Sequence, residues 1–298
     1  MDNVKKPVHL IINPISGYSD QKRRLEIFRK TVFEHGIDLV EHTTTGPGNA
    51  GEYALRHAGE SIAMVAWGGD GTAKEVANAL VGSDTPLMVT HGGTENLLAK
   101  VLKMPRDPQM LARLLIDPQL IKFDLGICNG SSFHTVLGVG FDAEVVRLVH
   151  ENRDGHITHL NYAWPLLKTF INYKFPMLKI SADGEDVFYG WGIAFVGNTH
   201  RYSMNLRICR DAVCDDGLLD LVVFQCNSKH SLLRHAFWTS MRKHIGRRSV
   251  IHQRVKNVHI ESDQPQLCEL DGDIGPKLPL DISLAEQKIN MIVPPWKI

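Results

Sequence analysis

Several common signatures of function are missing from this chain of 298 residues. The dipeptide Gly-Lys does not occur, which excludes the Walker-type loop that cradles phosphates in many nucleotide-binding proteins. The five cysteines are nowhere spaced as Cys-x-x-Cys, so they predict neither a zinc site nor a disulfide framework. No apolar run approaches the roughly 18 residues of a membrane span, and the N-terminus lacks the apolar stretch of a signal peptide. The sequence predicts a cytoplasmic protein, at most peripheral to the inner face of the membrane.

Acidic residues are absent from one long segment, 221–260, although 33 acidic and 33 basic residues balance over the whole chain. Lysines and arginines are frequent in that segment, where they are interleaved with Leu232, Phe237 and Trp238. Two interpretations stay open: a solvated basic face, or a surface that contacts an anionic membrane. The balanced total charge gives no argument for a nucleic-acid partner, and none is predicted. The sequence indicates no oligomeric state.

Up to about residue 120, apolar strand-like runs alternate with amphipathic helical stretches. The predicted strands are 9–12, 37–41, 62–66 and 86–90; the predicted helices are 23–34, 50–58, 73–80 and 96–102, and Asp107-Pro108 opens another. This alternation predicts an α/β domain with an open, mainly parallel sheet and helices on both faces. Ligands in such sheets bind beyond the carboxyl ends of the strands.

After Lys122 the pattern changes to short strands separated by turn signals, among them Asn129-Gly130 and Asp183-Gly184. Only two helical stretches are expected to interrupt the strands, near 158–173 and near 229–244. This part of the chain therefore predicts a β-rich sandwich domain. The boundary is expected near residue 125, and the last ~10 residues could pack back on the first domain.

The most informative motif is Gly68-Gly69-Asp70-Gly71-Thr72, between a buried strand and a helix. Its glycines let backbone N–H groups approach a polyphosphate, and the helix N-terminus adds partial positive charge. Asp70 stands in the middle of this turn. A carboxylate beside phosphates is repulsive unless it serves Mg²⁺ or the substrate's hydroxyl. The turn therefore predicts nucleotide-dependent phosphoryl transfer.

Two further glycine turns follow predicted strands of the same sheet. Asn13-Pro14-Ile15-Ser16-Gly17 comes after the first strand, and Gly92-Gly93-Thr94-Glu95-Asn96 comes after the strand that ends at Thr90. Because the carboxyl ends of parallel strands share one edge of the sheet, we expect the three turns to converge there.

In this order, the three turns resemble the catalytic domain shared by diacylglycerol kinases, sphingosine kinases and bacterial soluble lipid kinases. The resemblance continues into the second domain, at Gly138–Ala143, Asp216–Leu221 and Leu270–Asp273. It implies an α/β nucleotide-binding domain at 1–125, a β-rich lipid-binding domain at 126–298, and an active site in the cleft between them. It also implies a lipid kinase that uses ATP and Mg²⁺ and contacts its lipid substrate at a membrane surface.

The resemblance assigns roles to individual residues. ATP would contact Asn13, Pro14, Ser16, Gly17, Thr44, Gly68, Gly69, Asp70, Gly71, Thr72, Glu75, Thr94 and Asn96. Asp70 would lie beside the nucleotide's Mg²⁺, with Asp124 as a supporting acid. Asp216 and backbone carbonyls near Val213 and Leu218 would bind a second, structural Mg²⁺. Asp273 or Asp271 would accept the proton of the lipid hydroxyl.

Two positions depart from the family's pattern. Asp273 stands where the family usually has Glu, and its side chain is one methylene shorter; a displacement near 1 Å can cost on the order of 100-fold in rate. Leu97 follows Asn96 where bacterial members often have Asp.

Other functions stay open at this point. NAD kinases share the Gly-Gly-Asp-Gly turn, so the acceptor could be a soluble hydroxyl compound. The departure at Asp273 also leaves room for a non-catalytic regulator that binds lipid or nucleotide. Gly138–Ala143 fits a dinucleotide-binding fingerprint too, but no acid stands about 20 residues further on, which disfavours a dehydrogenase.

Overall fold

The computed structural model describes residues 6–17, 20–151, 159–203 and 206–296. The chain divides into two compact units, which we describe separately. The first unit combines Met1–Phe123 with Gln287–Ile298, and the second consists of Asp124–Glu286.

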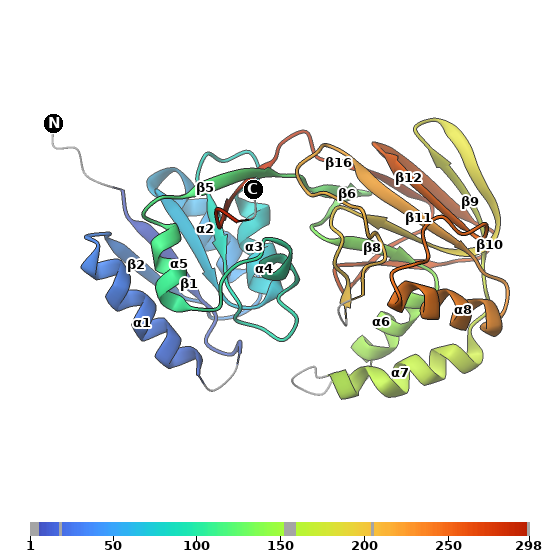
Figure 1. The fold of residues 1–298 in the computed structure, drawn as a ribbon, viewed down its shortest axis with the longest axis horizontal. Coiled ribbons are helices and arrows are strands. Elements are labelled where there is room, and N and C mark those ends of the chain that lie inside the picture. Colours follow the sequence, from blue (N-terminus) through green and yellow to red (C-terminus); the bar gives the residue numbers. More distant parts are fainter. Residues whose placement is uncertain (1–5, 18–19, 152–158, 204–205, 297–298) are drawn as a thin grey trace. The chain divides into compact units, whose positions relative to one another are not determined.

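The first unit is an alternation of strands and helices (Figure 1). Its elements are β1 (Val8–Ile12), α1 (Gln21–Glu34), β2 (Leu39–Thr43), α2 (Asn49–His57), a short 3₁₀ turn (Ala58–Glu60), β3 (Ala63–Trp67), α3 (Asp70–Ala79), β4 (Leu87–Val89), α4 (Leu97–Val101), α5 (Pro108–Leu114), β5 (Gln119–Phe123) and β17 (Ile289–Val293). The strands form one sheet in the order β2-β1-β3-β4-β17-β5. All are parallel except β5, which runs antiparallel to β17. The predicted α/β domain with a mainly parallel sheet is confirmed.

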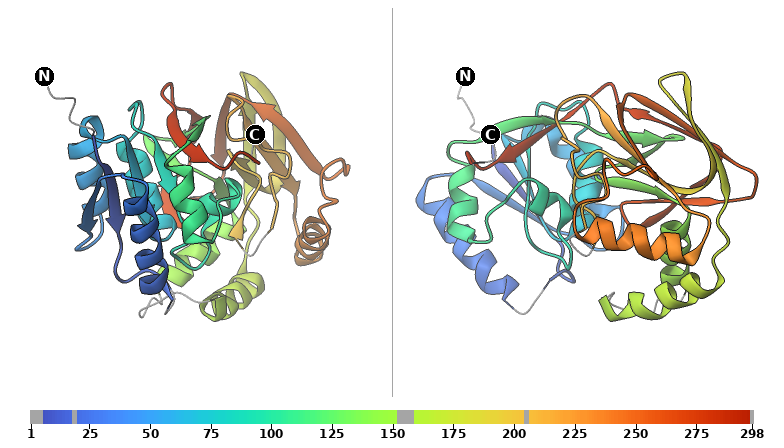
Figure 2. Two further views of the ribbon diagram at one scale, coloured as in Figure 1. Left: turned by 60° about the vertical axis from the view of Figure 1, so that its left-hand side comes forward. Right: turned by 45° about the vertical axis from the view of Figure 1, so that its right-hand side comes forward.

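The central strands β1 and β3 are buried at every position, as expected of parallel strands that are covered on both faces. From β1 the chain moves to β2 on one side, whereas from β3 it moves to β4 on the other. Because crossovers between parallel strands are right-handed, this reversal puts α1 on one face and α2 and α3 on the other. Accordingly, α1 packs beside α5, and α2 packs beside α3 (Figures 1 and 2). The strand order reverses between β1 and β3, and a crevice that can hold ligands is expected at this point.

The second unit contains most of the strands. They are β6 (Gly126–Cys128), β7 (Ser131–Phe133), β8 (Val136–Val139), β9 (Met177–Ala182), β10 (Glu185–Gly197), β11 (Leu219–Gln225), β12 (Val250–Val255), β13 (Asn257–Ser262), β14 (Leu267–Leu270), β15 (Asp273–Lys277) and β16 (Leu280–Leu284). They pair in the order β15-β14-β8-β10-β9-β13-β16-β6-β7, and β11 joins β10 to β12. The helices are α6 (Phe141–Glu151), α7 (His159–Asn172) and α8 (Lys229–Ser240).

The long strand β10 belongs to both layers of a sandwich, because it pairs with β9 along its first half and with β8 and β11 along its second. Alternate residues then face different cores. Ala194 and Val196 lie in the core between the layers, whereas Ile193 and Phe195 lie in a second core that also contains Leu232 of α8. The predicted β-rich sandwich is confirmed, and its outer face is covered by a helix.

The expectation of only two helices after Lys122 is wrong, because α6 is a third. Its valines, Val145, Val146 and Val149, have a high strand propensity. They are nevertheless buried on a helix, and Arg147 forms an ion pair with Glu144 one turn away. Tertiary packing therefore overrides the local preference. Helices α7 and α8 match the two that were predicted, although residue 158 lies outside the described part of the chain.

In the part of the chain that the structure describes, no helix is both long and apolar enough to cross a membrane.

Candidate active site

The three glycine turns meet at the edge of the first unit's sheet where the strand order reverses. The amide of Gly92 donates a hydrogen bond of 3.0 Å to the carbonyl of Gly68. A Cβ atom on Gly92 would lie 2.4 Å from that carbonyl oxygen, and one on Gly93 would lie 2.6 Å from the Cα of Gly69. Backbone therefore packs directly on backbone, which only glycine permits here. The expected convergence of the turns is observed.

Replacing Gly92 by alanine should lower the free energy of unfolding by about 1–3 kcal/mol, because the new methyl group overpacks a backbone contact that cannot move aside. The measurement is chemical denaturation. Gly71→Ala is the matched control, because a Cβ at Gly71 meets open space. Equal stability of the two variants would contradict the close approach of the turns.

Side chains of the first glycine turn form hydrogen bonds with the second and the third turn. Asn13 Nδ2 donates to Thr72 Oγ1 at 3.0 Å, and Ser16 Oγ donates to the carbonyl of Gly92 at 2.7 Å. Gly17 has φ +99°, and its Cβ would lie 2.7 Å from that same carbonyl oxygen. Pro14 lies exposed beside them. Asn13, Ser16 and Gly17 thus organise the turns, and contacts of these residues with ATP stay predictions.

Helix α3 begins at Asp70, three residues earlier than predicted. Its N-cap is Gly69, which has no side chain to accept a hydrogen bond from the first helical amides. An anion such as a phosphate can take that place, helped by the helix dipole. The carboxylate of Asp70 accepts a hydrogen bond from the amide of Leu98 at 3.4 Å. Asp70 is therefore located where phosphates would be expected, at the start of α3 and against the start of α4.

Glu75 and Thr44 both lie at the loop between β2 and α2. Both carboxylate oxygens of Glu75 accept backbone amides at the start of α2, from Gly48 at 2.8 Å and from Ala50 at 3.1 Å. The amide of Thr44 donates to the carbonyl of Ile12 at 2.8 Å, which holds the end of β2 beside the end of β1. Glu75 thus anchors the loop that follows Thr44. A contact of either residue with ATP stays a prediction.

In the third turn, Asn96 adopts a left-handed backbone with φ 52°. Its side chain accepts the amide of Gly93 and donates to the carbonyl of Gly93, both at 2.6 Å. Asn96 therefore closes the turn on itself, whereas Thr94 is exposed. Thr94 has the more favourable position for a ligand contact.

In the second unit, the predicted supporting acid and the predicted metal loop lie together. Asp124 is 2% exposed, and its Oδ2 accepts the amide of Gly217 at 2.8 Å. Asp216 Oδ1 accepts the amide of Leu218 at 3.0 Å, and Oδ2 forms an ion pair with Arg254. Asp124 thus shapes the loop that carries Asp216.

Hard oxygen ligands such as one carboxylate and the carbonyls near Val213 and Leu218 suit Mg²⁺. A cation at Asp216 would compete with the Arg254 guanidinium for the same oxygen. Among the described residues, no group of three or more His, Cys, Asp or Glu side chains could hold a metal ion. These residues fit a structural Mg²⁺ only if Arg254 moves away, so this metal site stays a prediction.

The two predicted proton acceptors differ in their surroundings. Asp271 and Gly272 have φ values of 54° and 86° and form the two-residue turn between β14 and β15. The carboxylate of Asp271 accepts the amides of His134 and Thr135, both at 2.8 Å, and the hydroxyl of Thr135 at 2.6 Å. Asp273, the first residue of β15, is exposed. Asp271 therefore anchors the turn, and Asp273 is the better placed of the two to meet a substrate.

A third acid, Glu269, lies beside these residues, and none of the sequence motifs singles it out. Glu269 is fully buried (0% exposed) in β14, and burial raises its pKa well above the usual value. The signal in the sequence is an acidic residue inside an otherwise apolar strand, directly before the Leu270–Asp273 motif.

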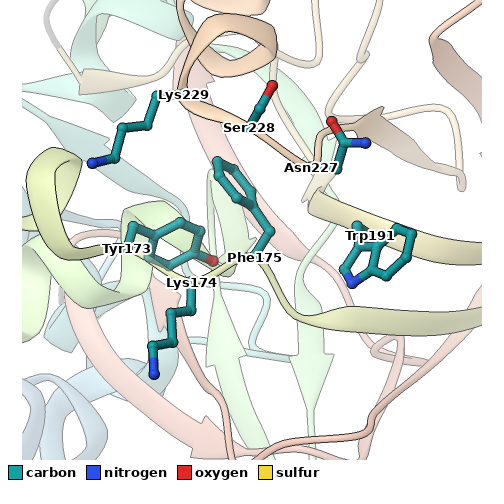
Figure 3. Close-up of a pocket in the computed structure, with 7 residues that line it drawn as sticks. All are labelled: Tyr173, Lys174, Phe175, Trp191, Asn227, Ser228 and Lys229. Carbon is teal, nitrogen blue, oxygen red and sulfur yellow. The ribbon is translucent and has the colours of Figure 1, made fainter.

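A pocket of about 470 Å³ opens in the second unit beside the start of α8 (Figure 3). Tyr173, Phe175 and Trp191 give it aromatic walls, and Lys174 and Lys229 add two cations. The amino group of Lys229 also donates to the backbone carbonyl of Ile171 in α7, which ties α7 to α8.

The comparisons with known proteins agree with this arrangement. Residues 7–128 match the family described as "Diacylglycerol kinase catalytic domain". Residues 135–293 match the family described as "YegS C-terminal NAD kinase beta sandwich-like domain". A diacylglycerol kinase of Mycobacterium tuberculosis is 28% identical over 297 residues, which cover 96% of this chain and 95% of that protein. A diacylglycerol kinase of Bacillus subtilis is 27% identical over 300 residues, which cover 98% of both.

Solved structures show the same fold. A diacylglycerol kinase from Bacillus anthracis has a TM-score of 0.73 at 22% sequence identity, with 98% of each chain covered. Another Bacillus anthracis structure has a TM-score of 0.80 at 24% identity and covers 98% of this chain and 99% of its own. The glycine turns, both domain matches and the relatives along nearly the whole length therefore lead to one conclusion: the chain belongs to the diacylglycerol kinase catalytic-domain family.

Proposed function

We propose that this protein is a lipid kinase that transfers the γ-phosphoryl group of MgATP to a lipid hydroxyl, of the diacylglycerol or the sphingoid type. The observation that carries the proposal is the convergence of three glycine turns around Asp70 at the start of α3. Relatives that are named diacylglycerol kinase support the choice of a lipid acceptor.

In the proposed reaction, the amides at the start of α3 and in the glycine turns bind the phosphates. Bound Mg²⁺ would neutralise charge that develops on the transferred group. Asp70 would hold the Mg²⁺ that accompanies the nucleotide. A bond forms between the acceptor oxygen and the γ-phosphorus while the bond to the β,γ-bridging oxygen breaks, and ADP leaves. The hydroxyl proton passes to the carboxylate of Asp273. The protein contributes mainly positioning and electrostatic stabilisation.

The acceptor class is tested with radiolabelled ATP and a panel of acceptors. Diacylglycerol and a sphingoid base are presented in mixed micelles, and NAD is presented in solution. We expect label in one of the lipids and none in NAD. Label in NAD alone would favour the soluble-acceptor alternative, to which the second domain's likeness to the NAD kinase sandwich points. ATP binding without transfer to any acceptor would favour a non-catalytic regulator.

A lipid substrate requires contact with a membrane, and exposed side chains of the second unit suit such a contact. Helix α7, helix α8 and the segment that follows α8 carry exposed apolar side chains and exposed cations. We call this set the α7/α8 surface; it comprises Trp164, Leu167, Ile171, Leu233, Phe237, Met241, Lys243 and Arg248. Apolar side chains enter the interface between headgroups and acyl chains, and cations attract anionic headgroups. This surface is the proposed peripheral membrane contact.

Replacing Lys243 and Arg248 together by glutamine should weaken binding to anionic vesicles by roughly 30-fold, because each cation near such a surface contributes about 1 kcal/mol. Vesicle sedimentation measures the effect. Lys179→Gln with Lys277→Gln is a charge-matched control on exposed strand positions of the same unit. The proposed contact would be wrong if both pairs of substitutions weakened binding equally.

A further inference from the structure

Three polar side chains from different elements meet behind the turn between β14 and β15. They are Asp142 at the start of α6, Glu269 in β14 and Tyr202 in the loop after β10. The hydroxyl of Tyr202 lies within hydrogen-bonding distance of both carboxyl groups. It forms a hydrogen bond with Asp142 Oδ2 and lies 3.2 Å from Glu269 Oε1. Burial raises the pKa of both carboxyl groups above their usual values. A protonated carboxyl group can donate a hydrogen bond to a neighbouring carboxylate, whereas two carboxylates have no donor between them.

The pair is accommodated by a glycine. Gly138 lies directly opposite Glu269 in the pairing of β8 with β14. A Cβ atom at Gly138 would lie 2.9 Å from Asp142 Oδ2 and 3.0 Å from Glu269 Oε1. The absence of a side chain at Gly138 leaves the room that the two carboxyl groups occupy. The glycine-rich segment 138–143 and the acidic segment 269–273 are therefore parts of one arrangement.

Glu269 connects this arrangement to the turn. Its Oε2 accepts the amide of Gly272 at 2.7 Å. On the other side of the turn, the carboxylate of Asp271 is held by the amides of His134 and Thr135. The two residues before Asp273 are thus both held in place. Glu269 holds Gly272, and backbone amides of the segment before β8 hold Asp271.

We propose that Glu269, Asp142 and Tyr202 are positioning residues that hold the 271–273 turn so that Asp273 presents its carboxylate to the acceptor hydroxyl. The inference rests on the proposed function for the role of Asp273. Its structural part, the bracing of the turn by Glu269, does not depend on that function. A displacement of Asp273 by about 1 Å would slow proton transfer strongly. Burying Glu269 costs free energy, and this cost is offset if Glu269 prevents such a displacement.

The protonation of this buried pair predicts a dependence on pH. Burial raises the pKa of both Glu269 and Asp142. The titratable groups that interact electrostatically with the pair are Tyr202, Tyr173, Cys268 and Asp271, from the loop after β10, the end of α7, β14 and the turn. A carboxyl group whose folded pKa is raised stabilises the fold fully below its unfolded pKa of about 4.3. That contribution is lost as the pH rises through the folded pKa.

The test compares Glu269→Gln with Glu269→Ala. Glutamine can still accept the Gly272 amide and donate permanently to Asp142, whereas alanine can do neither. We expect the alanine variant to lower kcat about 10- to 100-fold, to leave the KM for ATP within about twofold, and to speed hydrogen exchange in the segment 267–277. We expect the glutamine variant to keep kcat within about threefold at pH 7 and to retain activity at alkaline pH better than the wild type.

Two outcomes would overturn the inference. In the first, Glu269→Ala shows the same hydrogen-exchange rates as the wild type in the segment 267–277. In the second, Glu269→Gln lowers kcat and speeds exchange as much as Glu269→Ala does. If the alanine variant does not fold, the pH profile and the exchange of the glutamine variant decide. If the wild type transfers no phosphoryl group to lipid, the proposed function fails, and the exchange measurements still test whether Glu269 braces the turn.

Discussion

Replacing Asp70 by asparagine should lower kcat for phosphoryl transfer by at least about 1,000-fold, which corresponds to about 4 kcal/mol in the activation barrier. Asparagine has nearly the same size and can still accept the amide of Leu98 through its oxygen. The substitution therefore removes negative charge at the start of α3 with little change in packing. A carboxylate next to a polyphosphate is useful only if it interacts with the metal ion or with the transferred group.

The measurement is steady-state kinetics together with thermal unfolding. Asp117→Asn, at an exposed position of the same unit, is the matched control and should leave both unchanged. If Asp70→Asn kept more than a tenth of the wild-type kcat, Asp70 would have no direct part in the transfer. A loss of activity accompanied by a large drop in Tm would instead assign Asp70 a structural role.

Replacing Asp273 by asparagine should lower kcat by about 100- to 10,000-fold, the usual contribution of a general base. The KM for ATP should change little, because the glycine turns of the first unit are untouched. Asp273→Glu restores the longer side chain that is usual in the family, and we expect it to keep or raise kcat. Comparison of the three proteins at saturating ATP measures both effects.

Asp271→Asn separates the two candidate acids. Asp271 accepts three backbone amides and a hydroxyl, so its neutralisation should lower Tm as well as activity, because hydrogen bonds to charged groups contribute about 1.5–3 kcal/mol each. Asp273 is exposed, so Asp273→Asn should lower Tm less than Asp271→Asn does. The opposite pattern, with activity lost and Tm kept in Asp271→Asn alone, would exchange the roles of the two residues.

Local patterns were sufficient to predict the four parallel strands β1 to β4 of the first unit's sheet and the meeting of its glycine turns. Strands that are buried on both faces leave continuous apolar runs, as in β1 and β3. Glycines mark places where backbones touch, as at Gly68 and Gly92. Both signals are carried by neighbouring residues, so they can be read without knowledge of the fold.

Pairings between distant parts of the chain could not be predicted in this way. The sequence left open where the last residues would pack, and the structure inserts β17 between β4 and β5. Helix α6 was missed because its valines favour strands locally, and only packing in the folded unit makes it helical.

The partners of individual acidic side chains could not be predicted from the sequence either. Asp271 and Glu75 were predicted to serve the reaction or ATP, and those roles stay predictions; in the structure their carboxylates accept backbone amides of segments that are distant in sequence. Glu269 was not singled out at all, although it is buried beneath the turn. Which acid anchors the fold and which one faces a substrate is decided by tertiary contacts, which residue type and spacing do not reveal.

The most direct test of the proposed lipid kinase activity is transfer of radiolabel from γ-labelled MgATP into a total lipid extract by the purified protein, resolved by thin-layer chromatography beside the Asp70→Asn variant. The proposed activity predicts a labelled lipid with the wild type and none with the variant. Bound ATP with no labelled lipid, or a labelled lipid that persists in Asp70→Asn, would contradict it.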